Sequence, residues 1–153
     1  MLKAILKGAA AGAAGTTALN ATTYVDMAVR GRPVSSTPED TVEKLAEVAH
    51  LSIPGEGEKR ENRVAGLGPL SGITTGVGVG VLLGLTRAMG WRPAVTTTAV
   101  AATIAALVGA NVPMAALGIA DPRTWSATDW ASDVVPHLVY GLVTAATLDG
   151  LDQ

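Results

Sequence analysis

The chain has 153 residues, of which 48% are hydrophobic and only 16% are charged, and its formal net charge is −2. This balance is unusual for a soluble domain, and without a broad basic surface we expect no nucleic-acid partner. The absence of cysteine excludes disulfides, iron–sulfur ligation and a thiol nucleophile. The charges gather in a few blocks and leave long uncharged runs, a pattern typical of membrane proteins.

Four such segments have lengths that suit membrane-spanning helices. A spanning helix needs roughly 20 apolar residues to cross about 30 Å of hydrocarbon. We therefore expect a single membrane domain over residues 1–153, with spans at about 4–29, 64–88, 93–119 and 132–150. The uncharged run 134–148 is short, so it spans only if Asp133 and Asp149 lie at the two interfaces or if the bilayer thins locally. The predicted fold class is an all-α membrane bundle of four transmembrane helices with short surface helices.

The first segment also has features of a secretory signal peptide. Lys3 and Lys7 precede a run rich in Ala and Gly, and the Ala-Leu-Asn-Ala stretch at 18–21 resembles a cleavage site. The central region of a signal peptide is usually rich in Leu, whereas this run is rich in Ala and Gly. We therefore favour a retained first helix.

The segment 30–63 is the longest polar stretch and separates the first two predicted spans. A hydroxyl N-cap, a first-turn proline and two acidic residues indicate a helix start in Ser36-Thr37-Pro38-Glu39-Asp40. Apolar residues then recur at helical spacing, at Val42, Leu45, Ala46 and Ala49. The pattern predicts an amphipathic helix over 38–50 that lies on the membrane or on the bundle.

The distribution of Lys and Arg gives only a weak orientation signal. The side that holds segment 30–63 carries more basic residues than the side that holds both termini, which favours a cytoplasmic 30–63 loop. Lys3 and Lys7 argue for the reverse, so both orientations stay open. In the last loop, Trp125 and Trp130 mark an interface, and Ser126 with Asp129 has the capping-box spacing of a short surface helix.

Glycine recurs at every fourth position through the second predicted span, at Gly68, Gly72, Gly76, Gly80 and Gly84. Such a series forms a groove along one helix face, and close packing there replaces the hydrophobic force that lipid does not supply. Gly8 and Gly12 begin a similar face on the first span. We expect these seven helix-packing glycines to hold the bundle together as a glycine zipper. The alternative is an interface with a second copy or another subunit.

Polar side chains also occur at membrane depth. Asp133, His137 and Tyr140 lie on one face of the last predicted span, because their spacing is four and then three residues. Asn20 and Asn111 hold similar positions on the first and third spans. Buried polar groups need partners, so we expect these residues to face one another. Hydrogen bonding between helices is the favoured role, and a proton relay through the last span is the alternative.

Catalytic and metal-binding motifs find little support. The chain has no P-loop, no G-x-S-x-G and no H-E-x-x-H. Glu47 and His50 have the spacing of one metal half-site, but without a second copy a solvated surface pair is the better interpretation. We therefore expect no catalytic residues, no metal ligands and no cofactor, and the chain is predicted not to be an enzyme.

The stretch Gly12-Ala-Ala-Gly-Thr-Thr-Ala-Leu-Asn, the Gly31-Arg32-Pro33 stop and the Thr37-Pro38-Glu39 helix start resemble small bacterial inner-membrane proteins of the YagU-like group. The residue usage is similar to that of actinobacteria. The resemblance implies a multi-pass protein of the bacterial cell inner membrane, and it carries over no functional residue. We expect a non-catalytic accessory or scaffold subunit of a larger membrane complex, whose partners are the lipid bilayer and other membrane subunits or a second copy. The alternative is a small channel or transporter that uses the polar stripe of the last span.

Overall fold

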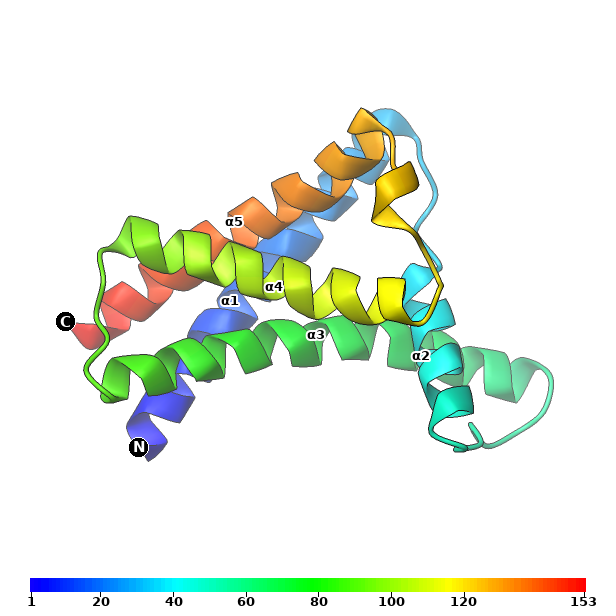
Figure 1. Ribbon diagram of the computed structural model, residues 1–153, viewed down its shortest axis with the longest axis horizontal. Helices are drawn as coiled ribbons and strands as arrows, with labels where there is room; N and C mark the ends of the chain where they lie inside the picture. Colours follow the sequence, from blue (N-terminus) through cyan, green and yellow to red (C-terminus); the bar gives the residue numbers. More distant parts are fainter.

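The computed structural model describes residues 1–153 and consists of helices joined by short connections (Figure 1). Four long helices make up most of it: α1 (Leu2–Arg30), α3 (Glu58–Ala88), α4 (Val95–Ala116) and α5 (Ala127–Asp152). The short helix α2 (Thr37–Val48) and the 3-10 turn η1 (Pro122–Thr124) lie in the connections. The predicted all-α class is therefore confirmed.

Three of these helices, α3, α4 and α5, are long and apolar enough to cross a membrane, which suggests a multi-pass membrane protein. The prediction of four such helices is wrong, because α1 is uncharged in its middle without being apolar enough. Its middle consists largely of Ala, Gly and Thr and includes Asn20. Small and hydroxylated side chains bring little apolar area per residue, so a long uncharged run is not by itself a membrane span.

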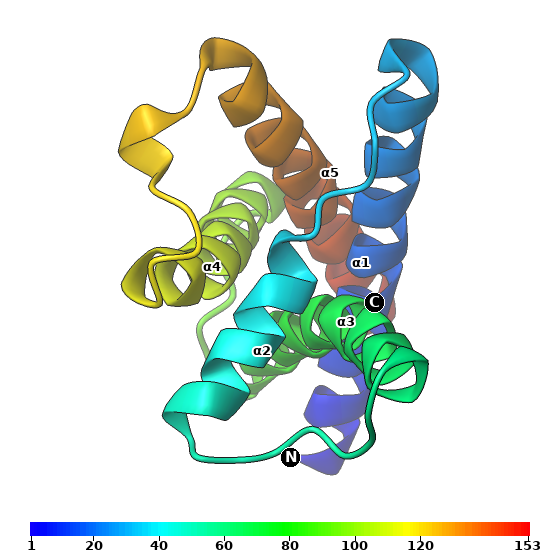
Figure 2. The same cartoon turned by 90° about the vertical axis from the view of Figure 1, so that its right-hand side faces the viewer.

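The order of packing places α1 between two neighbours. α1 packs along both α3 and α5, α5 packs along α4, and α3 meets α4 less extensively. Toward the end where α2 lies, the α1–α5 pair leans away from the α3–α4 pair, so the bundle opens there like a wedge (Figures 1 and 2). Both termini lie at the opposite, closed end (Figure 1).

Local sequence signals explain several helix boundaries. α1 ends at Gly31, whose φ of 63° is a left-handed conformation that glycine adopts without strain. Ser126 and Asp129 form a capping box, but it starts α5 itself and not a separate surface helix. Pro113 lies inside α4, which ends three residues later at Ala116. α2 lies where the sequence predicts the amphipathic helix over 38–50.

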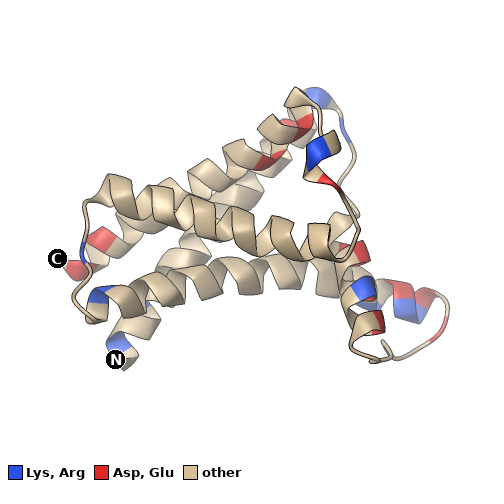
Figure 3. Ribbon diagram, viewed as in Figure 1, with Lys and Arg blue, Asp and Glu red and all other residues tan.

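Charged residues lie at the two ends of the bundle. Figure 3 shows Lys, Arg, Asp and Glu near the termini and around α2 and the connection from α4 to α5, with an uncharged length of helix between them. This distribution fits an apolar slab crossed by α3, α4 and α5.

Candidate functional site

α1 and α3 cross with their main chains in contact. A Cβ placed on Gly12 would lie 2.6 Å from the carbonyl oxygen of Gly76, and one on Gly80 would lie 2.6 Å from the Cα of Gly12. A Cβ on Gly8 would lie 2.9 Å from the Cα of Val81. Side chains do not reach such distances from rigid main chain, so any larger residue here must push the two helices apart.

The remaining glycines of the α3 series meet different surroundings. A Cβ on Gly84 would lie 3.0 Å from the Cα of Gly8, at the closed end of the same crossing. A Cβ on Gly68 would lie 3.0 Å from the main-chain nitrogen of Glu39, so this glycine faces α2. Gly72 has no atom within 4 Å of its Cβ direction. The structure thus places three of the five α3 glycines against α1, one against α2, and one toward open space.

Tyr140 of α5 sits where α1, α3 and α5 meet. Its side chain is fully buried, and its hydroxyl donates a hydrogen bond of 2.6 Å to the carbonyl oxygen of Gly76. Gly15 of α1 makes room for the ring, because a Cβ there would lie 2.8 Å from Cδ2 of Tyr140. Thr144, one turn further along α5, is also fully buried and lies beside Gly15.

A second close approach joins α4 and α5. A Cβ on Gly141 would lie 2.5 Å from the carbonyl oxygen of Ala99, and the Thr103 hydroxyl donates to the same oxygen at 2.9 Å. Sequence reasoning singled out neither Gly141 nor Gly15. A lone glycine inside a helix costs about 1 kcal/mol relative to alanine, so each of these glycines was a sequence signal for close packing.

Three of the five expected intramembrane polar residues come together at the wedge end of α4 and α5. Asn111 donates a hydrogen bond of 2.8 Å to the Asp133 carboxylate, and His137 Nδ1 lies 2.7 Å from the Asp133 carbonyl oxygen. The His137 and Asp133 side chains are 12% and 19% exposed. Tyr140 instead reaches Gly76, and the half-buried Asn20 makes no hydrogen bond to these residues.

An ion-pair cluster at the closed end was not predicted. Arg87 of α3 is only 6% exposed, and its Nη1 lies 3.0 Å from Asp152 and 3.8 Å from Asp149. Lys7 of α1 pairs with Asp152 at 3.0 Å, so one carboxylate joins α1, α3 and α5. The topology was the signal that could have predicted this cluster. In a bundle whose helices alternate in direction, the start of α1 lies at the same end as the ends of α3 and α5.

Polar and aromatic contacts also lie at the wedge end. Arg30 of α1 forms an ion pair with Asp26 at 3.1 Å and donates a hydrogen bond to Ser132 of α5. Trp125 and Trp130 pack edge to face with their ring centroids 5.1 Å apart. These contacts hold the end of α1 against the start of α5 and order the α4–α5 connection. They lie where the membrane–water interface would be.

The connection from α4 to α5 also carries a tight ion pair. The hydrogen bond from the Arg123 guanidinium holds the pKa of the Asp121 carboxyl below its usual range. Both groups are exposed, so this pair orders the turn more than it stabilises the fold.

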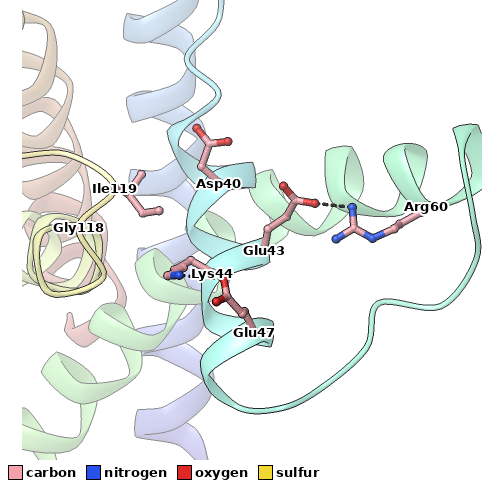
Figure 4. Close-up of a pocket in the computed structure, with 7 residues that line it drawn as sticks. All are labelled: Asp40, Glu43, Lys44, Glu47, Arg60, Gly118 and Ile119. Atoms are coloured by element: carbon pink, nitrogen blue, oxygen red, sulfur yellow. Dashed lines mark hydrogen bonds and ion pairs between the residues drawn. The ribbon is translucent and has the colours of Figure 1, made fainter.

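A shallow groove runs between α2, the start of α3 and the end of α4 (Figure 4). Its floor is polar, with Glu43 paired to Arg60 and Lys44 paired to Glu47 at 2.8 Å. No group of three His, Asp or Glu side chains is placed to hold a metal ion. The arrangement offers charged pairs that satisfy one another and no nucleophile next to a base.

The fold and these contacts define a small helical membrane protein whose interior is built from glycine contacts and short polar networks. Comparison of the chain with known protein families, with curated proteins and with solved structures finds no match.

Proposed function

We propose that the chain is a non-catalytic accessory or scaffold subunit of a larger complex in the bacterial inner membrane. The observation that carries this proposal is that the buried hydroxyls of Tyr140, Thr16 and Thr103 bind main chain within the bundle. The hydroxyl of Thr144 has no hydrogen-bond partner, but it is fully buried and closed off from the surface. Tyr140 donates to Gly76 across helices, and Thr16 and Thr103 donate to carbonyls one turn back in their own helices, at 2.8 and 2.9 Å. A reaction or transport site needs polar groups free to meet a substrate.

The glycine contacts support a structural role for α1. We propose that Gly8 and Gly12 pack with Gly76 and Gly80 as a glycine zipper. Lipid is as apolar as the helices, so no hydrophobic force draws helices together in the bilayer. Close packing between main chains can instead hold the weakly apolar α1 there. In this proposal α1 enters the membrane only beside α3 and α5.

The outer face of α4 is the proposed contact with a partner subunit. Four β-branched side chains, each more than half exposed, repeat every fourth residue along it, at Val100, Ile104, Val108 and Val112. Rigid branched side chains lose little conformational freedom on packing, so they suit contact between helices. The stripe runs along most of α4 and is free of polar residues.

The test is the composition of the complex extracted from native membranes with a mild detergent. Native mass spectrometry should find the chain with other subunits in a fixed ratio. Ile104→Trp with Val108→Trp should release it, whereas Leu82→Trp, on an exposed position of α3, should not. A wild-type chain that is extracted only as a monomer would contradict the proposed role.

A small channel or transporter is the second candidate. It is favoured by the half-buried cluster of Asn111, Asp133 and His137, which places one carboxylate and one imidazole at the wedge end. Such a pair can exchange a proton in a bilayer. Flux through the reconstituted protein separates the two candidates.

A further inference from the structure

α2 crosses α3 where the charged part of α3 gives way to its apolar part. Residues 58–63 contain most of the charges of α3, and the uncharged run begins at Val64. On one side of this border Arg60 pairs with Glu43 of α2, and on the other Gly68 lets the main chain at Glu39 approach closely. α2 is therefore anchored at the level where a membrane that contains the apolar part of α3 would end.

The direction of α2 also agrees with a position at the membrane border. In Figure 1 α2 runs across α3 and not along it, and Figure 2, which views α3 nearly end-on, shows α2 beside α3 with its length spread across the view. A helix that lies across a spanning helix at the membrane border lies in the membrane plane. The Trp125–Trp130 pair, at the same end of the bundle, marks the same border with the side chains that favour the headgroup zone.

The side chains of α2 divide into three faces. Gly68 and Arg60 of α3 meet one face, and the polar side chains of Asp40, Lys44 and Glu47 line the groove of Figure 4 on the second. Leu45 and Val48, three residues apart, belong to the third face and are 55% and 59% exposed. Leu51, just after the helix, is 69% exposed. These three residues form an apolar edge, and the rest of the chain leaves more than half of each of them uncovered.

We propose that the apolar edge of α2 binds the lipid surface, so that α2 is an interfacial helix that fixes how deeply the wedge end of the bundle sits. The depth and direction of α2 indicate that lipid covers this edge. An apolar helix face that lies in the membrane plane, at the border of the hydrocarbon, meets acyl chains. Transfer of these exposed leucine and valine side chains from water to acyl chains favours this placement. The inference rests on the proposed placement of α3 in the membrane.

Nitroxide labels test the proposal on the full chain in lipid nanodiscs. Because the chain has no cysteine, single labels at Leu45→Cys, Val48→Cys and Glu47→Cys need no background substitution. Collisions with oxygen, which concentrates in lipid, and with a water-soluble nickel chelate are measured for each label. We expect oxygen to dominate at 45 and 48, and nickel to dominate at 47 by at least threefold.

Two outcomes would overturn the proposal. Nickel collisions at 45 equal to those at 47 would place the edge in water, and protection of 45 and 48 from both reagents would mean that protein covers it. A label at Leu82→Cys, on the exposed side of α3, serves as the lipid reference. If position 82 is also dominated by nickel, the membrane placement of α3 itself fails. If nickel dominates at 45 and 48 but not at 82, α3 stays in the membrane and only the inference about α2 fails.

Discussion

The hydroxyl of Tyr140 in α5 donates a hydrogen bond of 2.6 Å to the main-chain carbonyl oxygen of Gly76 in α3. These two helices have few other contacts, because α1 lies between them over most of their length. The glycine also leaves room for side chains of both neighbours, since a Cβ at position 76 would lie 3.3 Å from Cε2 of the tyrosine ring and would collide with the Thr16 hydroxyl of α1. One donor on α5 and one missing side chain on α3 therefore fix where three helices meet.

Tyr140→Phe should weaken the bundle without unfolding it. The ring still fills its site, while the lost hydrogen bond costs about 1 kcal/mol. The measurement is the unfolding midpoint in a detergent titration followed by circular dichroism. Tyr24→Phe is the matched control, because Tyr24 is 61% exposed on α1, and it should leave the midpoint unchanged. Equal midpoints for the Tyr140 variant and the wild type would show that the bond contributes nothing.

Gly80→Leu and Gly72→Leu should differ sharply although both positions belong to the same four-residue series. A side chain at 80 meets the main chain of Gly12, whereas one at 72 meets nothing within 4 Å. We expect Gly80→Leu to cost at least about 3 kcal/mol, and Gly72→Leu to cost less than about 1 kcal/mol. The fraction of monodisperse protein after extraction measures both. Similar losses from the two variants would show that the α1–α3 crossing does not determine stability.

Sequence reasoning predicted most helix positions because their boundaries are local. Gly31 and the capping box of Ser126 and Asp129 act through their own main chain and need no knowledge of the fold. The box nevertheless predicted a separate surface helix, since a cap marks where a helix starts and not how far it continues. The sequence predicted α1 as a fourth membrane span because its middle is uncharged. That middle consists largely of Ala, Gly and Thr, so it is not apolar enough to count as a span.

The candidate site was harder to predict because it depends on which helices lie side by side. The four-residue spacing of glycine places Gly72 and Gly80 on one face, yet the wedge leaves Gly72 uncovered. Arg87 and Asp152 are 65 residues apart in sequence, and only the alternating direction of the helices brings them together. Spacing within one helix is a local property, whereas these contacts depend on the angle between helices.

Asp152→Ala should destabilise the closed end of the bundle more than Lys7→Ala does. Arg87 is 6% exposed, so loss of its main partner leaves a buried charge that Asp149, at 3.8 Å, only partly compensates. We expect a cost of about 3 kcal/mol for Asp152→Ala. Lys7 has a side chain 37% exposed, and its removal should cost less than about 1 kcal/mol. Thermal unfolding in detergent ranks the two variants, and the reverse order would refute the argument.

The membrane placement of α1 should depend on its contact with α3. Single cysteines at Lys3→Cys, in the first turn of α1, and at Val34→Cys, just after its end, can be labelled in sealed vesicles with a membrane-impermeant maleimide. The two positions should lie on opposite sides in the wild type and on the same side once Gly80→Leu is added. Glycine contacts, and not hydropathy, would then hold α1 in the bilayer. Opposite sides in both backgrounds would mean that α1 inserts without this crossing.

His137→Asn separates the scaffold proposal from the transport alternative. His137 Nδ1 lies 2.7 Å from the Asp133 carbonyl oxygen, and an asparagine amide can donate a hydrogen bond from nearly the same position. An imidazole can take up and release a proton and an amide cannot, so only a proton path should require the histidine. We expect the variant to fold like the wild type, and both proteins to give proton flux no higher than empty liposomes. Flux through the wild type that disappears in His137→Asn, with folding unchanged, would support the transport alternative and remove the basis of the scaffold proposal.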